Sequence, residues 1–409
     1  MRWLVFIATV VMVAPAAAQP ADEPFRWSAL GADGKLLVRS VLTGDAACPK
    51  MVADGVESPM RRRAAAAAGF PVVVCEARAP ATTMKLTVAG APTPVLVKEV
   101  RRIVVIGDTG CRLEGRAVQD CDDSRAWPFA AIARRAAGHK PDLVIHVGDY
   151  YYRETPCPAE RAGCVGSPYG DSWATWRADF FTPAAPLLSA APWIMVRGNH
   201  ELCKRGAQGW RRLLDPHPAS ADCADFTDPY ELHLGGLRLL VLDSAAADDF
   251  SAPAEKVAAY AAQLASLPRM PSTQFWLLTH RPIWALAQGE LAGQNLNATL
   301  QAAIRGRIPP GLDLVLSGHL HDFTSYEFGS ERPAQLIVGD SGDAMLPLRK
   351  VPLVGAEIDG IKTRNGFALE RFGFFVLERT AVGWDGTLYD PNDAVIARCR
   401  LSGRALECR

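Results

Sequence analysis

Seven short apolar segments after Arg101 constrain the fold of this chain more than any other feature of its sequence. They are separated by longer polar or alanine-rich stretches, of which Phe129–Ala137 and Ala254–Leu267 are typical of helices. Near-continuous apolar strands are typical of sheets that are buried on both faces, so the pattern predicts a layered α/β domain. The segments are Ile103–Ile106, Leu143–Val147, Trp193–Val196, Leu237–Leu242, Phe275–Thr279, Leu312–Leu316 and Leu336–Val338.

Five of these predicted strands end in a loop that bears Asp, Asn or His. Ligands of open α/β sheets gather at the carboxyl ends of the strands, and a preceding glycine lets the backbone turn sharply close to an ion. Each motif alone is weak evidence, because Gly-Asp turns and single histidines are common, but together they predict a metal centre. The loops are Gly107-Asp108-Thr109-Gly110, Gly148-Asp149-Tyr150-Tyr151-Tyr152, Gly198-Asn199-His200-Glu201, His280-Arg281-Pro282 and Gly318-His319-Leu320-His321.

The ordered set of motifs resembles that of the calcineurin-like metallophosphoesterase superfamily and, within it, that of the purple acid phosphatases. The motifs are GD-x-G, GD-x-x-Y, GNHE, a single His after a strand, and GH-x-H, and they lie between Asp108 and His321. One departure is Leu277, since the family often has Val three places before the residue that matches His280. The resemblance implies a layered αββα sandwich with a small N-terminal β domain.

The same resemblance implies a pair of metal ions and their ligands. Gly110 stands where most superfamily members have the histidine of a D-x-H motif, and Tyr152 stands where the purple enzymes place a phenolate. A hard, anionic oxygen favours Fe(III) over a softer divalent ion. The alternative is that Tyr152 packs its loop as one of three consecutive tyrosines. The implied iron ligands are Asp108, Tyr152 and His321, those of a divalent ion (Zn, Mn or Fe(II)) are Asn199, His280 and His319, and Asp149 bridges both ions.

The implied function is hydrolysis of phosphate monoesters of small molecules, by attack of a metal-bound hydroxide on phosphorus. His200 resembles the histidine that donates hydrogen bonds to phosphate or protonates the leaving alkoxide, and its alternative role is to orient the loop. Two other functions stay open: a phosphodiesterase on the same fold, and a non-catalytic exported metal-binding protein. The complete set of ligands and His200 argue against the second of these.

The first 18 residues predict export, so the mature protein is expected to be secreted or periplasmic. Arg2 precedes the apolar run Trp3–Val13, and Ala16-Ala17-Ala18 before Gln19 fits a signal-peptide cleavage site. The alternative is a membrane anchor, but the apolar run is too short to span a bilayer comfortably and is followed by Pro15. The mature form is therefore predicted to have no membrane segment.

Ten cysteines indicate disulfides in an oxidising compartment. No two of them have the C-x-x-C spacing of a zinc ribbon or a thioredoxin-type site. Spacing does not fix the connectivity, but joining neighbours in the sequence gives the pairs Cys48–Cys75, Cys111–Cys121, Cys157–Cys164, Cys203–Cys223 and Cys399–Cys408.

Composition and charge narrow the class of protein. Hydrophobic residues make up 49% and charged residues 22%, as in globular domains. The 44 Lys and Arg residues equal the 44 Asp and Glu residues, so no general basic surface for nucleic acid is implied. The predicted domains are a signal peptide (1–18), a β-rich domain (19–98), a catalytic domain (99–390) and a disulfide-pinned tail (391–409). Strands are expected in the β-rich domain at Leu36–Val41, Pro71–Val74, Met84–Val88 and Pro94–Val97.

Overall fold

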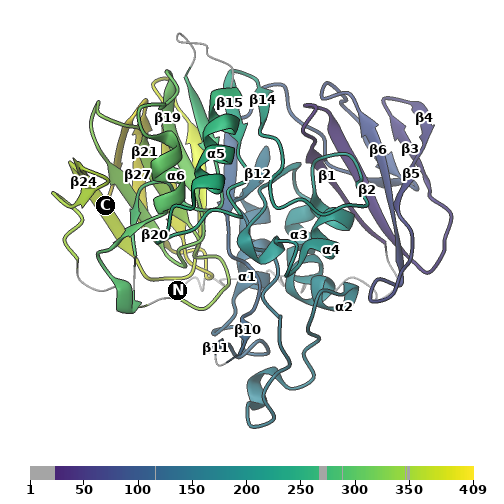
Figure 1. Ribbon diagram of the computed structural model, residues 1–409. Helices are drawn as coiled ribbons and strands as arrows, with labels where there is room; N and C mark the ends of the chain where they lie inside the picture. The colour runs from purple at the N-terminus through teal and green to yellow at the C-terminus, as the bar shows by residue number, and fades with distance from the viewer. Residues whose placement is uncertain (1–23, 116, 267–273, 288, 346, 348–350) are drawn as a thin grey trace, which may run out of the picture.

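Two large β-sheets form the framework of the fold (Figure 1). The computed structural model describes residues 24–115, 117–266, 274–287, 289–345, 347 and 351–409, so the predicted signal peptide lies outside the described residues. The first sheet has 11 strands, in the order β28 (Ala405–Cys408), β27 (Val395–Ser402), β26 (Trp384–Tyr389), β25 (Phe374–Arg379), β9 (Arg102–Ile106), β12 (Leu143–His146), β13 (Trp193–Met195), β1 (Phe25–Leu30), β2 (Leu36–Thr43), β6 (Val72–Ala79) and β5 (Arg61–Ala64).

The second sheet has seven strands, and two-stranded hairpins lie in the loops outside the large sheets. Its order is β14 (Tyr230–Leu234), β15 (Leu237–Val241), β16 (Phe275–Leu278), β19 (Leu312–Ser317), β21 (Ala334–Val338), β20 (Phe323–Glu327) and β24 (Asn365–Leu369). All seven strands predicted from the apolar segments after Arg101 are thereby confirmed. The hairpins are β10 (Leu113–Glu114) with β11 (Ala117–Val118), β17 (Ala285–Leu286) with β18 (Asn295–Leu296), and β22 (Glu357–Ile358) with β23 (Ile361–Lys362).

The helices include the two that the sequence predicts. In α1 the buried residues Phe129, Ile132, Ala133 and Ala136 recur at helical spacing, which gives the helix one apolar face. The α-helices are α1 (Phe129–Gly138), α2 (Trp173–Trp176), α3 (Thr182–Leu188), α4 (Ala207–Gly209), α5 (Ala254–Ser266) and α6 (Ala298–Ile304). The 3₁₀ and π segments are η1 (Ala162–Cys164), η2 (Arg177–Phe181), η3 (Asn199–Glu201), η4 (Trp210–Leu214) and η5 (Gly289–Leu291).

Three apolar clusters show how the layers pack. One lies between the two sheets and joins Val105 of β9 to Leu239 of β15 and Leu316 of β19. A second packs α1 and α3 against the outer face of the first sheet, and a third packs α5 and α6 against the second sheet. In Figure 1, α5 and α6 lie over the green strands of that sheet. The order of helix, sheet, sheet and helix confirms the predicted αββα sandwich.

The N-terminal strands continue the first sheet. β1 pairs in parallel with β13 through Ala29 and Trp193, and β2, β6 and β5 follow it outward. Four further strands form a small separate sheet: β4 (Val56–Pro59), β3 (Lys50–Ala53), β7 (Leu86–Val88) and β8 (Ala91–Pro92). The N-terminal β region is therefore present, at the right of Figure 1, while its exact boundary stays a prediction.

One predicted N-terminal strand is wrong, because residues 94–97 form no strand. Pro94 has no N–H to donate to a neighbouring strand, and its carbonyl oxygen instead accepts a hydrogen bond from Ser28 Oγ at 2.8 Å.

The C-terminal segment is part of the first sheet. β25 pairs antiparallel with β9, and β26, β27 and β28 follow as a meander whose last two strands are joined by Cys399 and Cys408. The other four sequential disulfide pairs are also present, so the predicted connectivity is confirmed. Five disulfides are typical of an extracellular or periplasmic protein.

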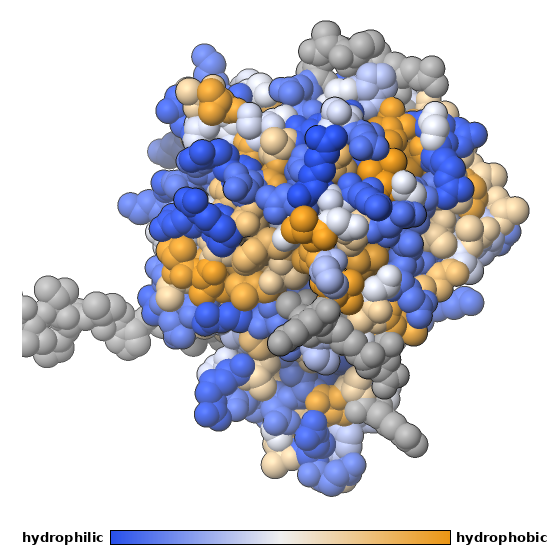
Figure 2. All heavy atoms as spheres, turned by 90° about the vertical axis from the view of Figure 1, so that its left-hand side faces the viewer, coloured by the Kyte–Doolittle hydropathy of each residue, from blue (hydrophilic) through white to orange (hydrophobic). Residues whose placement is uncertain are grey.

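The face shown in Figure 2 carries hydrophilic side chains that surround smaller hydrophobic areas. Among the residues that the structure describes, none of the helices combines the length and the apolarity needed to cross a bilayer.

A buried carboxyl group makes the stability of the fold dependent on pH. Asp340 follows β21, and among the described residues neither of its oxygens has a hydrogen-bond partner in another residue. Burial, with the nearby charge of Asp322, raises the pKa of Asp340 to about 8. An unfolded aspartate has a pKa of about 3.9, so the folded protein binds more protons between these values and its stability falls as the pH rises from about 4 to about 8.

We expect Asp340→Asn to remove this slope and to raise the free energy of unfolding at pH 8 by on the order of a few kcal/mol. Urea unfolding at pH 5 and pH 8 measures both effects. Asp385→Asn is the matched control, because Asp385 is 58% exposed and its substitution should leave the profile unchanged. A variant of Asp340 with the slope of the wild type would contradict the expectation.

Candidate metal centre

The five predicted loops meet at the carboxyl ends of β9, β12 and β13 from the first sheet and of β16 and β19 from the second. Two contacts join the sheets at this place. His280 Nδ1 lies 2.9 Å from Val147 O, and the backbone N–H of His319 donates to Asp108 Oδ2 at 3.0 Å. All eight predicted site residues lie in these loops, and they converge as the carboxyl-end rule requires.

One group of donor atoms surrounds the hydroxyl oxygen of Tyr152. This oxygen lies 3.0 Å from Asp108 Oδ1, 2.9 Å from Asp149 Oδ2 and 3.2 Å from His321 Nε2. Asp108 and Tyr152 are fully buried, and His321 is nearly so. Three residues named by sequence as ligands of one ion are thus in mutual contact.

A second group surrounds Nε2 of His280. This nitrogen lies 3.1 Å from Asn199 Oδ1 and 3.1 Å from Asp149 Oδ2. The atom that both groups share is a single oxygen, Asp149 Oδ2. The other oxygen, Oδ1, accepts the backbone N–H of His200 at 2.9 Å, which fixes the orientation of the carboxylate.

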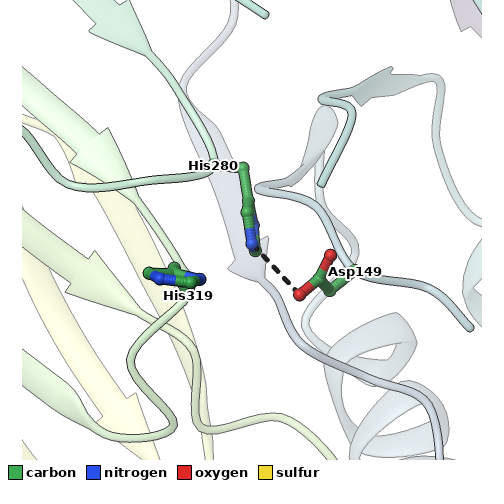
Figure 3. A group of neighbouring side chains, drawn as sticks. All are labelled: Asp149, His280 and His319. Atoms are coloured by element: carbon green, nitrogen blue, oxygen red, sulfur yellow. Dashed lines mark ion pairs between the residues drawn. The ribbon is translucent and has the colours of Figure 1, made fainter. Parts of the chain in front are cut away.

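His319 completes the second group. Figure 3 shows Asp149, His280 and His319 approaching one another from three separate loops, and each can offer one ligand atom within 4.8 Å of the others. His319 Nε2 lies 3.0 Å from Asp249 Oδ2, so its Nδ1 is the nitrogen left for an ion. A carboxylate on the far nitrogen of a ligand histidine fixes the tautomer and the orientation of the ring.

The donor set fits a pair of cations. Ligand atoms about 2.1 Å from one ion and at right angles lie about 3.0 Å apart, which matches the separations in both groups. Three of the predicted ligands also have a left-handed backbone, with φ of 54° at Asp108, 58° at Asp149 and 73° at His319. Such conformations are costly outside glycine and cluster at functional sites.

Glycines allow the loops to approach this closely. A Cβ atom at Gly110 would lie 2.9 Å from Tyr152 Cδ2 and from the backbone nitrogen of Tyr152. At Gly198 a Cβ atom would overlap the carboxylate of Asp149. The absence of a side chain at Gly110 therefore makes room for the ring of Tyr152 beside Asp108.

The pKa values of the buried acidic groups also favour the binding of cations at this site. Burial and the neighbouring Asp149 raise the pKa of Asp108 well above its usual value. Burial, Asp108 and Asp149 likewise raise the pKa of Tyr152. Burial opposes ionisation of Asp149 as well, but His280 and His200 hold its pKa well below the usual range. Cations at the shared oxygen would favour the ionised forms of all three groups.

His200 lies beside Tyr152, with ring centroids 3.9 Å apart. Its Nδ1 lies 2.7 Å from Glu154 Oε1, and its Nε2 lies 3.8 Å from Asp149 Oδ2. Burial lowers the pKa of His200 to about 3. The neighbouring Glu201 accepts the backbone N–H groups of Tyr150 and Gly198.

Several residues of the site were missed by sequence reasoning. Glu154 and Arg205 contact His200, while Asp249 and Arg281 contact His319. Asp343 pairs with Arg112 and lies 3.2 Å from His321 Nδ1.

The sequence carries a signal for only some of these contacts. Glu154 and Arg281 lie within two residues of a motif position, and Asp343 follows β21 in a loop that begins Gly339-Asp340. This loop follows a strand and carries glycine and aspartate, so it has the same pattern as the five loops predicted from the sequence. No sequence signal marks Asp249.

A layered αββα fold with oxygen and imidazole donors at its strand ends defines the class of this protein as an α/β protein with a candidate metal centre. The family model for calcineurin-like phosphoesterases matches residues 101–323, more than half of the chain. The chain therefore belongs to the calcineurin-like phosphoesterase family, whose members use a pair of metal ions.

Solved structures agree with this assignment at the level of the fold. Purple acid phosphatase PPD1 from yellow lupin (Lupinus luteus) seeds has a TM-score of 0.60 and 15% identity, over 92% of this chain and 73% of that chain. PhoD has a TM-score of 0.56 and 12% identity, over 96% of this chain and 93% of that chain. The comparison with curated proteins found no match.

Proposed function

We propose that this protein is an exported phosphatase that hydrolyses phosphate monoesters with a pair of metal ions. The observation that carries the proposal is the shared oxygen, Asp149 Oδ2, which lies within 3.1 Å of Tyr152 Oη on one side and of His280 Nε2 on the other. A carboxylate placed between two donor groups suits two ions held close together, because its negative charge offsets their repulsion.

The two donor groups differ in charge, which supports two different ions. Asp108, Tyr152 and His321 include two anionic oxygens, whereas Asn199, His280 and His319 are neutral ligands. The anionic set suits Fe(III), and the neutral set with the shared carboxylate suits Zn, Mn or Fe(II). When bound, such a pair supplies an activated water and stabilises charge on the phosphoryl oxygens.

The chain's own residues supply the remaining parts of the mechanism. His200 lies beside Tyr152 with Nδ1 held by Glu154, so its Nε2 is directed to the side of Asp149, where a phosphoryl oxygen would be bound. We assign it to hydrogen bonding with phosphate and, because the negative charge of a bound phosphate raises the pKa that burial lowers, to proton donation to the leaving group. Asp249 is a positioning residue, because it acts on the site through His319.

Rates on chromogenic esters test the reaction. Metal-loaded protein is expected to hydrolyse p-nitrophenyl phosphate with a kcat/KM at least about tenfold above that for bis-p-nitrophenyl phosphate, because the second ester group removes one of the anionic oxygens that the ions hold. The reverse order would favour the phosphodiesterase. A protein that binds metal but hydrolyses neither ester would support the non-catalytic alternative. Export is tested separately, by the N-terminal sequence of protein recovered outside the cytoplasm.

A further inference from the structure

Two arginines that the proposed mechanism does not use lie against the candidate metal centre. The guanidinium carbon of Arg112 lies 4.8 Å from the centre of the Tyr152 ring. Arg205 Nη2 lies 2.9 Å from His200 Nδ1. Because the rings of Tyr152 and His200 are themselves in contact, both guanidinium groups lie beside the place where substrate would be bound.

A single carboxylate joins the two arginines. Glu114 Oε2 accepts from Arg112 Nη1 at 2.8 Å, and Glu114 Oε1 accepts from Arg205 Nη2 at 2.9 Å. One oxygen of the same anion is thus held by each guanidinium. This arrangement recognises an anionic group with two oxygens, such as a carboxylate or a phosphate.

Of the carboxylates around these arginines, Glu114 is the one that a bound anion can most easily displace. Its side chain is 39% exposed, whereas that of Asp343, the other partner of Arg112, is fully buried. Glu154, the other partner of Arg205, is 17% exposed and also contacts His200. If Glu114 swings into water, Asp343 and Glu154 still hold the arginines in place, and one anion replaces another without a change in the number of buried charges.

The backbone around the arginines is firmly held, so the pair is preorganised. Leu113 of β10 donates its N–H to Tyr152 O at 3.0 Å, and its carbonyl oxygen accepts from Glu154 N and Thr155 N. The disulfide Cys111–Cys121 begins next to Arg112, and Cys203–Cys223 begins two residues before Arg205. A site whose donors are already fixed loses little entropy when an anion is bound.

We propose that Arg112 and Arg205 form a subsite for a second anionic group of the substrate, which Glu114 occupies when no such substrate is bound. The second group is a phosphate or a carboxylate only a few bonds from the phosphoryl group that is hydrolysed, because the subsite directly adjoins Tyr152 and His200. The inference rests on the proposed function and predicts that, among its substrates, monoesters or anhydrides with two neighbouring anionic groups are preferred.

Calorimetry on the metal-loaded protein tests the subsite without turnover. The probes are methylphosphonate, with one anionic group, and methylenediphosphonate and phosphonoacetate, whose second group is a phosphonate or a carboxylate. We expect the wild type to prefer one or both two-group probes over methylphosphonate by about 10- to 100-fold, the usual range for charge-assisted hydrogen bonds. The probe that is preferred identifies the second group.

A second anionic group can also bind the metal ions, so a preference for two-group probes does not by itself identify the arginines. Variants show whether the arginines cause the preference. Glu114→Gln is expected to strengthen the preference several-fold, because a neutral side chain competes less for the arginines. Glu378→Gln, at an exposed pair with Arg102, is the matched control and should change nothing. Arg112→Ala and Arg205→Ala are expected to reduce the preference at least about tenfold while methylphosphonate stays bound.

An unchanged preference in both arginine variants, or in Glu114→Gln, would overturn the subsite. Failure of the proposed function has a different signature, because wild-type protein would then discriminate among the probes without hydrolysing p-nitrophenyl phosphate. The reverse result, hydrolysis without discrimination, would refute the subsite alone.

Discussion

Replacing Asp149 with asparagine is expected to abolish hydrolysis and to release at least one metal ion. Asp149 Oδ2 is the one atom common to both donor groups, at 2.9 Å from Tyr152 Oη and 3.1 Å from His280 Nε2. A neutral amide no longer offsets the repulsion between two cations, and its uncharged oxygen is a weaker ligand than a carboxylate oxygen for both of them. We expect kcat/KM for p-nitrophenyl phosphate to fall by at least about a thousandfold, beyond the 10- to 100-fold typical of residues that merely support a ligand.

Elemental analysis of the purified variant and its rate on p-nitrophenyl phosphate measure the two effects. Asp142→Asn is a matched control at the opposite end of the same strand, β12. The Asp142 carboxylate accepts the backbone N–H groups of Arg101 and Arg102 at 2.8 Å, contacts that an asparagine oxygen can retain. Wild-type metal content and rate in Asp149→Asn would remove the basis of the two-ion proposal.

Tyr152→Phe is expected to remove the visible absorption of the iron-loaded protein. A phenolate bound to Fe(III) gives a charge-transfer band, and phenylalanine offers no oxygen to the ion. Loss of this anionic ligand should also weaken iron binding by at least about 10- to 100-fold. The ring itself fits without change, since its contacts with His200 and with the guanidinium of Arg112 do not need the hydroxyl group.

Absorption spectra of wild type and variant at matched iron content test this expectation. Tyr151→Phe is the control, because Tyr151 is the neighbouring residue but its buried ring stacks on Trp176, 5.8 Å between centroids. That variant should keep its colour. A colourless wild type with full zinc occupancy would refute the assignment of iron, although hydrolysis could then still occur.

The sequence carried enough information to list the residues that meet in the candidate metal centre. Each strand that leads to a donor is a near-continuous apolar run, and most of the donors directly follow a strand or a glycine. The other two, Tyr152 and His321, lie within three residues of such a donor. Such patterns are local, so they can be recognised in the sequence without knowledge of the strand order. The carboxyl-end rule then places Asp108, Asp149 and Asn199 together, because parallel strands β9, β12 and β13 end at the same edge.

The contacts that other polar side chains make around these donors could not be predicted in the same way. Asp249 lies 70 residues from His319 along the chain, and Asp343 lies 231 residues from Arg112. Polar loop residues have no periodic pattern, so their meeting depends on how the two sheets pack. Glu114 on β10 belongs to the same class, since its contact with Arg205 spans 91 residues.

Sequence alone determined which segments become central strands and which strand ends carry the candidate donors, since these follow from local apolar runs and short motifs. The spacing of the cysteines left their pairing open, and the structure decided it in favour of sequential neighbours. Only the tertiary structure decided that β1 joins β13, that β25 to β28 cover the other side of β9, and that one oxygen of Asp149 serves both donor groups. Strand pairing depends on contacts between distant parts of the chain within one sheet, and the shared oxygen depends in addition on how the two sheets pack, because Asp149 and His280 follow strands of different sheets.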